Sequence, residues 1–133
     1  ALNATDRAAL IYSVMDAGRG HVYTASYRYN DQGLLHQITP EAVIDPRDIL
    51  LDSNQAMFFV GDGAIKYRDI FRDKAGKVTI AETSQQHIRG SAVGVLGRDK
   101  FLSNELLNPA AFVPVYLRPA DAKPGKPLFN NKT

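Results

Sequence analysis

The fold is decided by residues 10–29, whose sequence is LIYSVMDAGRGHVYTASYRY. All but one of the first six residues are apolar, and the run is rich in β-formers, which predicts a buried strand ending in the glycine-containing turn 16–20. Residues 21–30 then alternate between two faces, as a second strand does. Asn and Gly in residues 30–33 favour a turn, and residues 34–39 complete a third strand. We therefore expect the chain to open as a three-stranded antiparallel meander.

Helices and strands are expected to alternate after the meander. Asp45 is placed to cap a short helix that contains Pro46 and runs to about Asp52. Residues 56–60 are continuously apolar, which indicates a central strand buried on both faces and parallel to a neighbour. Apolar residues then recur at helical spacing over residues 64–74, which predicts another helix.

The last part of the chain holds one more short strand and one more helix. Residues 78–81 fit the strand, and one face of the helix is apolar through Ile88, Ala92, Val95 and Leu96. Three glycines weaken this helix, and we expect them to allow close packing: Gly90, Gly94 and Gly97. The order of elements predicts an α/β fold with a mixed sheet and helices packed on it.

Composition limits the classes of protein that the sequence can encode. The 133 residues suit one domain, and 44% hydrophobic with 23% charged residues is an ordinary globular balance. The absence of cysteine excludes disulfides, thiolate zinc sites and a cysteine nucleophile. A formal net charge of +2 argues against a dedicated nucleic-acid binder. With no apolar run of the ~20 residues that a membrane helix needs and no signal-peptide pattern, we expect a soluble cytoplasmic protein without membrane contact.

Two loops could hold a ligand. In the turn 16–20, Asp16 and Arg19 stand beside glycine amides and could face a phosphate or its metal ion. In the loop 60–64, the amides of Gly61 and Gly63 precede a helix and could hold an anion or the edge of a nucleotide. The alternative for each loop is a plain turn, with Asp62 as helix cap in the second. Neither contains a complete dinucleotide or P-loop motif, so both interpretations stay open.

No motif for catalysis or metal binding is present. The three histidines are far apart in sequence and lack zinc-ligand spacing, and no G-x-S-x-G nucleophile elbow occurs. We therefore assign neither catalytic nor metal-binding residues.

Three segments together resemble the TsaB family. Residues 14–27 resemble its "D-A-R-x-G-E-V-Y-x-A-x-Y" segment, residues 60–64 its next glycine motif, and residues 114–122 its "P-x-Y-L-R-P-x-D-A" terminus. Order and spacing agree from about residue 11 to residue 122. Gly18 and His21 replace the family's usual Arg and Glu, so the first turn lacks its usual charges.

The resemblance implies an actin-like ATPase, RNase H-like fold built from two similar halves. The chain resembles only the second, C-terminal half, as a domain of residues 1–122 followed by a flexible basic tail, 123–133, with the N-terminal half absent. The four loop residues Asp16, Arg19, Gly61 and Gly63 would then be vestigial nucleotide-binding positions. No cofactor would be required, and binding of ATP or ADP would be weak. Tyr116 and Arg118 would hold the final segment onto the domain.

The function that the resemblance implies is a non-catalytic scaffold in the biosynthesis of threonylcarbamoyladenosine in tRNA. Its partners would be TsaD, contacted mainly through the absent half, TsaE, and tRNA only indirectly. The alternatives are a peptidase, as the family's glycoprotease name implies, half of a small-molecule kinase, or a structural dimerisation module. Because a missing half leaves an apolar face in water, we also expect the chain to form a homodimer.

Overall fold

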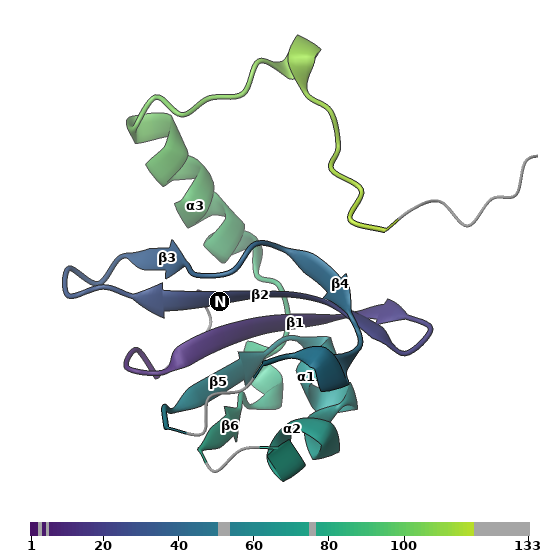
Figure 1. The fold of residues 1–133 in the computed structure, drawn as a ribbon. Helices are drawn as coiled ribbons and strands as arrows, with labels where there is room; N and C mark the ends of the chain where they lie inside the picture. Colours follow the sequence, from purple (N-terminus) through teal and green to yellow (C-terminus); the bar gives the residue numbers. More distant parts are fainter. Residues whose placement is uncertain (3, 5, 51–53, 75–76, 119–133) are drawn as a thin grey trace, which may run out of the picture.

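A computed structural model describes residues 1–118 except 3, 5, 51–53 and 75–76 (Figure 1). The predicted tail, 123–133, and the last residues of the terminal motif lie outside the described residues.

The antiparallel meander is confirmed. Strand β1 (Leu10–Gly18) pairs with β2 (His21–Tyr29), and β3 (Leu35–Gln37) pairs with the far end of β2. The first turn is shorter than predicted, because a register shift between Asp16 and Gly18 lets β1 continue past Asp16. Asp16 is therefore a strand residue. Only Arg19 and Gly20 connect the strands, with φ of 54° and 79°.

The remaining strands complete an open mixed sheet in the order β3-β2-β1-β5-β6. The predicted apolar strand β5 (Met57–Val60) is central and runs parallel to both β1 and β6 (Val78–Ile80). A sixth strand, β4 (Ala42–Ile44), was not predicted and pairs with the beginning of β2. Its three residues are too few to show the alternation that identifies a strand in sequence.

The helices differ from the predicted ones in length. Asp45 caps a 3-10 helix, η1 (Pro46–Asp48), through its side chain, as predicted, but the helix ends before residue 52. The helix predicted over residues 64–74 is two helices, α1 (Asp62–Lys66) and α2 (Arg68–Lys74). Tyr67 separates them, because its φ of −109° and ψ of 21° depart from helical geometry.

The main core lies between the sheet and the helices that cover one of its faces (Figure 1). Phe59 of β5 is fully buried and stacks on Tyr12 of β1 and on Phe71 of α2, with ring centroids 4.9 and 4.5 Å apart. A smaller cluster on the other face contains Ile11 and Phe58. The buried Ala81 belongs to the same cluster. It lies just before a second 3-10 helix, η2 (Thr83–Gln85).

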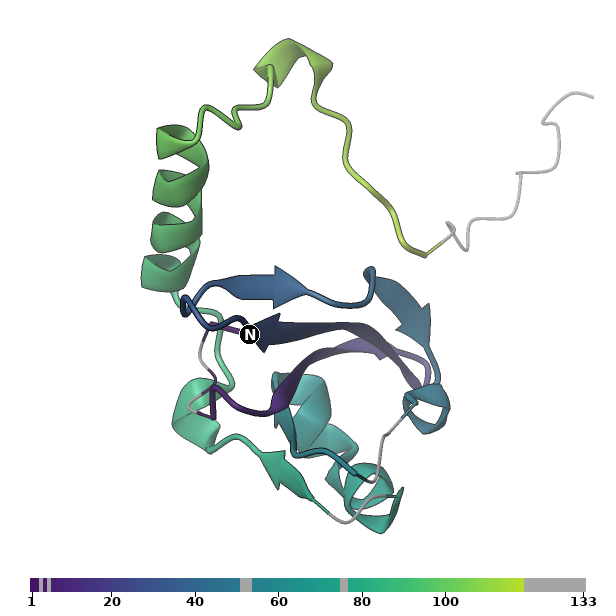
Figure 2. The same cartoon turned by 60° about the vertical axis from the view of Figure 1, so that its left-hand side comes forward.

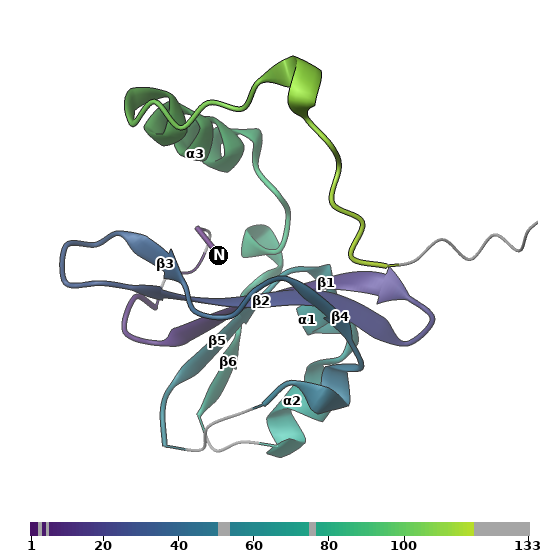
Figure 3. The same cartoon turned by 45° about the horizontal axis from the view of Figure 1, so that its top comes forward.

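The predicted last helix exists as α3 (Gly90–Leu102), but its apolar face is not buried. Ile88 is 72% exposed, Leu96 is 50% exposed, and of the thirteen helical residues only Ala92 is partly covered. The expected close packing at its glycines is wrong, because nothing lies within 4 Å of a Cβ placed at any of the three. Figures 2 and 3 show α3 standing away from the sheet.

The chain then continues as an extended segment with a third 3-10 helix, η3 (Pro109–Ala111), and returns to the sheet at Arg118. We call residues 88–118 the arm. No residue of the arm is buried.

Candidate functional site

The two loops expected to hold a ligand lie side by side at one end of the sheet. Strand β5 is parallel to β1 and feeds directly into α1, so the start of α1 packs against the end of β1. The amide of Asp16 donates to Oδ1 of Asp62 over 3.2 Å, although 46 residues separate them. Arg19 lies beyond this contact, in the exposed turn after β1.

The carboxylate of Asp16 has three partners within the chain. Lys66 donates to Oδ2 over 2.7 Å, and the amide of Gly18 and the hydroxyl of Tyr67 donate to Oδ1 over 3.1 and 3.4 Å. The hydrogen bond from Lys66, followed by that from Gly18, lowers the pKa of Asp16 below its ordinary value. The same contact raises the pKa of Lys66. Asp16 is therefore an ionised carboxylate held in an ion pair.

Gly61 and Gly63 stand where α1 begins, pressed against β1. Gly61 has a φ of 118°, and a Cβ there would lie 2.1 Å from the carbonyl oxygen of Val14. A Cβ at Gly63 would lie 3.0 Å from the carbonyl carbon of Met15. This close approach by itself requires residues without a side chain.

Both glycine amides also have acceptors in the chain. The amide of Gly61 donates to Oε1 of the buried Gln86, and the amide of Gly63 donates to Oδ1 of Asp62 over 2.9 Å. Asp62 is not the helix cap considered in the sequence, because Gly61 is the N-cap and Asp62 is the first residue of α1. Its side chain instead joins α1 to β1. The assignment of Asp16, Arg19, Gly61 and Gly63 to a ligand stays a prediction.

Three residues of this cluster could not be found from the sequence. Lys66 and Tyr67 reach Asp16 across 50 and 51 residues of chain. Gln86 reaches Gly61 from the loop after β6. Only the parallel pairing of β1 with β5, and of β5 with β6, brings these positions together. No local pattern encodes these contacts.

The four predicted residues do not share the cavity that Gly61 lines. Gly61 lines a cavity of about 260 Å³ together with Ser13, Met15 and Gln86. Asp16, Arg19 and Gly63 are not among its lining residues.

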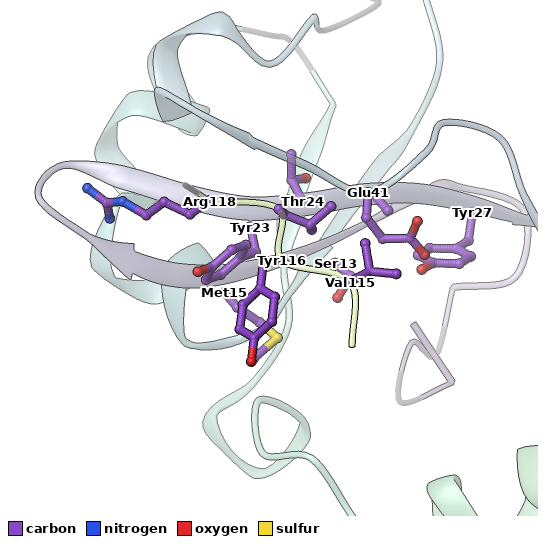
Figure 4. A pocket seen from close by; sticks show the side chains of 11 residues that line it. Ser13, Met15, Tyr23, Thr24, Tyr27, Glu41, Val115, Tyr116 and Arg118 are labelled. Carbon is purple, nitrogen blue, oxygen red and sulfur yellow. The ribbon is translucent and has the colours of Figure 1, made fainter. Parts of the chain in front are cut away.

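A larger cavity, of about 410 Å³, lies between the helix-free face of the sheet and the end of the arm (Figure 4). Arg118 lines the cavity and donates to the carbonyl oxygen of Ala17 over 2.8 Å. Tyr116 extends toward Met15 and Tyr23, with 83% of its surface exposed. That Tyr116 and Arg118 hold the final segment onto the domain stays a prediction. The hydrogen bond from Arg118 to Ala17 is the contact in its favour.

The far end of this cavity brings a carboxylate close to a phenol. Glu41 lies beside Tyr27 in Figure 4. Burial raises the pKa of Tyr27, and the negative charge of Glu41 raises it further. Tyr27 therefore stays a neutral hydrogen-bonding group at ordinary pH.

Two further properties concern only the described part of the chain. No three His, Asp or Glu side chains lie close enough together there to hold a metal ion. None of its helices combines the length and apolar character needed to cross a membrane.

Comparison with known proteins shows which class of protein has this fold. No family model matches the chain. Two solved structures from Pseudomonas aeruginosa share the fold: a protein described as similar to the peptidase YeaZ (TM-score 0.67, 21% identity, 86% of this chain and 51% of that one) and YeaZ (TM-score 0.64, 20% identity, 83% and 50%). The open mixed sheet with helices packed on it is thus an actin-like, RNase H-like domain, as predicted.

A match in sequence to a curated protein narrows the class further than the shared fold does. The chain is 32% identical over 118 residues to the tRNA threonylcarbamoyladenosine biosynthesis protein TsaB of Bacillus subtilis, covering 86% of this chain. It therefore contains a TsaB/YeaZ-like domain, which confirms the resemblance seen in the sequence. The match spans 49% of the relative, so the chain corresponds to about half its length.

Proposed function

We propose that the chain is a non-catalytic support domain in the biosynthesis of threonylcarbamoyladenosine in tRNA. The observation that carries the proposal is the 32% identity to TsaB over 86% of the chain. In this role the domain supports TsaD, with TsaE as a further partner and tRNA contacted only indirectly.

The cluster around Asp16 favours support over catalysis. A general base or nucleophile must reach the substrate with an available lone pair. Asp16 instead accepts hydrogen bonds from Lys66, Gly18 and Tyr67, and its lowered pKa makes it a poor base. The cluster joins β1 to α1 and to Tyr67 at the end of α1, which is a structural task.

The hydrogen bonds that the loop amides already make also bear on nucleotide binding. An incoming phosphate would have to displace Gln86 from the amide of Gly61 and Asp62 from the amide of Gly63. Because each displacement breaks a hydrogen bond already made, we propose that ATP and ADP bind weakly and that no cofactor is required.

A chimera tests the proposed role. The half of Bacillus subtilis TsaB that aligns with this chain is replaced by it, and threonylcarbamoyladenosine in tRNA is measured in cells without their own TsaB. We expect the modification to be restored. The matched control carries Phe71→Asp, which places a charge in the core and should abolish restoration. A folded chimera that restores nothing would reject the proposal.

Assays on the purified chain separate support from catalysis. We expect neither proteolysis nor ATP hydrolysis above background. Turnover that survives repurification and disappears in Asp16→Ala would instead establish an enzyme, either a peptidase or part of a kinase.

A further inference from the structure

The cavity of about 410 Å³ between the helix-free face of the sheet and the end of the arm is separate from the cluster around Asp16 (Figure 4). Its volume lies within the range of sites that bind small molecules. Most of its wall is apolar or aromatic, with Met15, Tyr23 and Tyr27 on the sheet and Val115 and Tyr116 on the arm. The cavity therefore offers a mainly apolar surface to a ligand.

Glu41 is the acidic side chain that lines this cavity. In the part of the chain that the structure describes, Glu41 forms no ion pair. Lys100 lines the adjoining groove between the sheet and α3 together with Glu41, but it pairs with Glu105 over 3.3 Å. The carboxylate of Glu41 thus brings to the cavity a negative charge without a cation at ion-pair distance among the described residues.

The basic side chain that lines the cavity lies at its other end. Arg118 extends away from Glu41 in Figure 4 and donates to the carbonyl oxygen of Ala17. Tyr23 and Tyr116 lie between these two charged groups in the same view, on the far side of Val115 from Glu41. The cavity therefore has an acidic end and, next to it, an apolar stretch.

The acidic end has the groups that recognise an ammonium ion. The carboxylate of Glu41 accepts charge-assisted hydrogen bonds, which are stronger than neutral ones. Tyr27, beside Glu41 in Figure 4, presents a neutral phenol oxygen that accepts a hydrogen bond and an aromatic ring that attracts a cation. An anion would be repelled by Glu41, and a neutral ligand would leave its charge uncompensated.

We propose that this cavity binds an alkylammonium ion, which is a primary ammonium group on an unbranched apolar chain. The ammonium group donates to the carboxylate of Glu41 and to the phenol oxygen of Tyr27, and the apolar chain runs past Val115 toward Met15 and Tyr116. Free alkylamines and the lysine side chain of another protein share this chemistry. The inference goes beyond the proposed function and does not rest on it, since none of these residues belongs to the cluster around Asp16.

Calorimetric titration of the 133-residue chain at pH 7 tests the proposal, with n-hexylammonium chloride as the probe. We expect a dissociation constant of about 1 mM or lower, which is reasonable for so small a ligand. 1-Hexanol has the same chain without the charge and should bind about tenfold more weakly, because it lacks the charge-assisted hydrogen bond. Hexanoate, whose charge is reversed, should not bind. Shortening the chain to n-butylammonium should weaken binding by up to about fourfold for each methylene removed.

Two variants with the same substitution locate the ammonium group. Glu41→Gln removes the negative charge and keeps the size of the side chain, and it should raise the dissociation constant of n-hexylammonium about tenfold. Glu105→Gln is the matched control, because Glu105 is exposed and does not line the cavity. It should leave the affinity unchanged. Both positions lie outside the core, and circular dichroism checks that each variant is folded.

A further probe distinguishes the two sources of the ligand. Nα-acetyl-lysine methylamide carries the same ammonium group and four-carbon chain as n-butylammonium, with a peptide backbone added. Tighter binding than that of n-butylammonium would identify the lysine side chain of a protein as the ligand. Equal or weaker binding would identify a free alkylamine.

Three outcomes would overturn the proposal. The first is no binding of n-hexylammonium at 10 mM. The second is equal affinity for n-hexylammonium and 1-hexanol, which would show an apolar cavity without selectivity for a cation. The third is an equal effect of Glu41→Gln and Glu105→Gln, which would place the ammonium group outside this cavity.

Discussion

Gly61 adopts a backbone conformation that L-residues rarely reach, directly beside a neighbouring carbonyl. Its φ is 118°, and a Cβ would lie 2.1 Å from the oxygen of Val14. A side chain at residue 61 would strain the backbone and clash with Val14. A shift of β1 cannot relieve this, because β1 is paired with a strand on each side.

We predict that Gly61→Ala lowers the free energy of unfolding by about 3 kcal/mol or more, measured by urea denaturation. Gly94→Ala is the matched control. It lies on exposed α3 with open space around it, so it should be neutral or stabilise by up to ~1 kcal/mol. An equal effect at the two glycines would show that β1 and α1 do not approach as closely as described.

The ion pair between Asp16 and Lys66 makes stability depend on pH. The folded-state pKa of Asp16 lies below its ordinary value of 3.8, because Lys66 and the amide of Gly18 stabilise the carboxylate. Its contribution is therefore present above that value and is lost as the pH falls through the folded pKa. At the alkaline end, the raised pKa of Lys66 means that the contribution is lost as the pH rises through it.

We predict that Asp16→Asn is less stable than the wild-type chain near neutral pH, and that the difference shrinks as the pH falls below about 4. Midpoints of urea unfolding between pH 2 and 7 measure it. Asp69→Asn, at a carboxylate that is 86% exposed, should follow the wild-type profile throughout. A difference for Asp16→Asn that persists unchanged at pH 2 would contradict an ionic origin.

At this scale the sequence identified the positions but not their contacts. Turn chemistry singled out Asp16 and Gly61, yet their partners Lys66 and Gln86 lie 50 and 25 residues away. Such pairs follow from the path of the chain in space, which no local pattern encodes. The need for glycine at residue 61 likewise comes from the backbone of β1.

At the scale of elements, α2 is attached to the sheet mainly through one aromatic side chain. Phe71 is fully buried and stacks on Phe59, which stacks in turn on Tyr12. The three rings thus join α2, β5 and β1 in one column.

We predict that Phe71→Ala costs about 3–5 kcal/mol of unfolding free energy, the range for removing a buried aromatic side chain. Phe101→Ala on α3, where the ring is 66% exposed, should cost little in the monomer. Thermal or urea unfolding compares the two variants, and a small loss for Phe71→Ala would mean that α2 is only loosely attached.

The sequence predicted elements well where a pattern was long. β1, β2 and β5 combine alternation or continuous apolarity with glycine at their ends, and each was found at its predicted place. The break at Tyr67 was missed because apolar spacing continues through it at Ala64 and Ile70. α3 was found, but spacing alone cannot state whether its apolar face has a surface to cover it.

At the scale of the whole molecule, the chain divides into a body and the arm. Every buried residue among those described lies between Ala4 and Gln86. The body thus contains the entire sheet, both core clusters and the cluster around Asp16. The arm carries instead residues 114–118 of the terminal motif and thirteen of the eighteen exposed large hydrophobic side chains among the described residues.

This division predicts that residues 1–87 fold without the arm. The shortened chain loses no buried apolar side chain. It loses the exposed hydrogen bond between Arg89 and Ser84 and the one between Arg118 and Ala17, together about 1–2 kcal/mol. Its free energy of unfolding should therefore lie within about 2 kcal/mol of that of the dilute full chain. The variant Arg118→Ala isolates the part due to that hydrogen bond. An unfolded or molten shortened chain would show that the arm belongs to the core, and the division into body and arm would have to be abandoned.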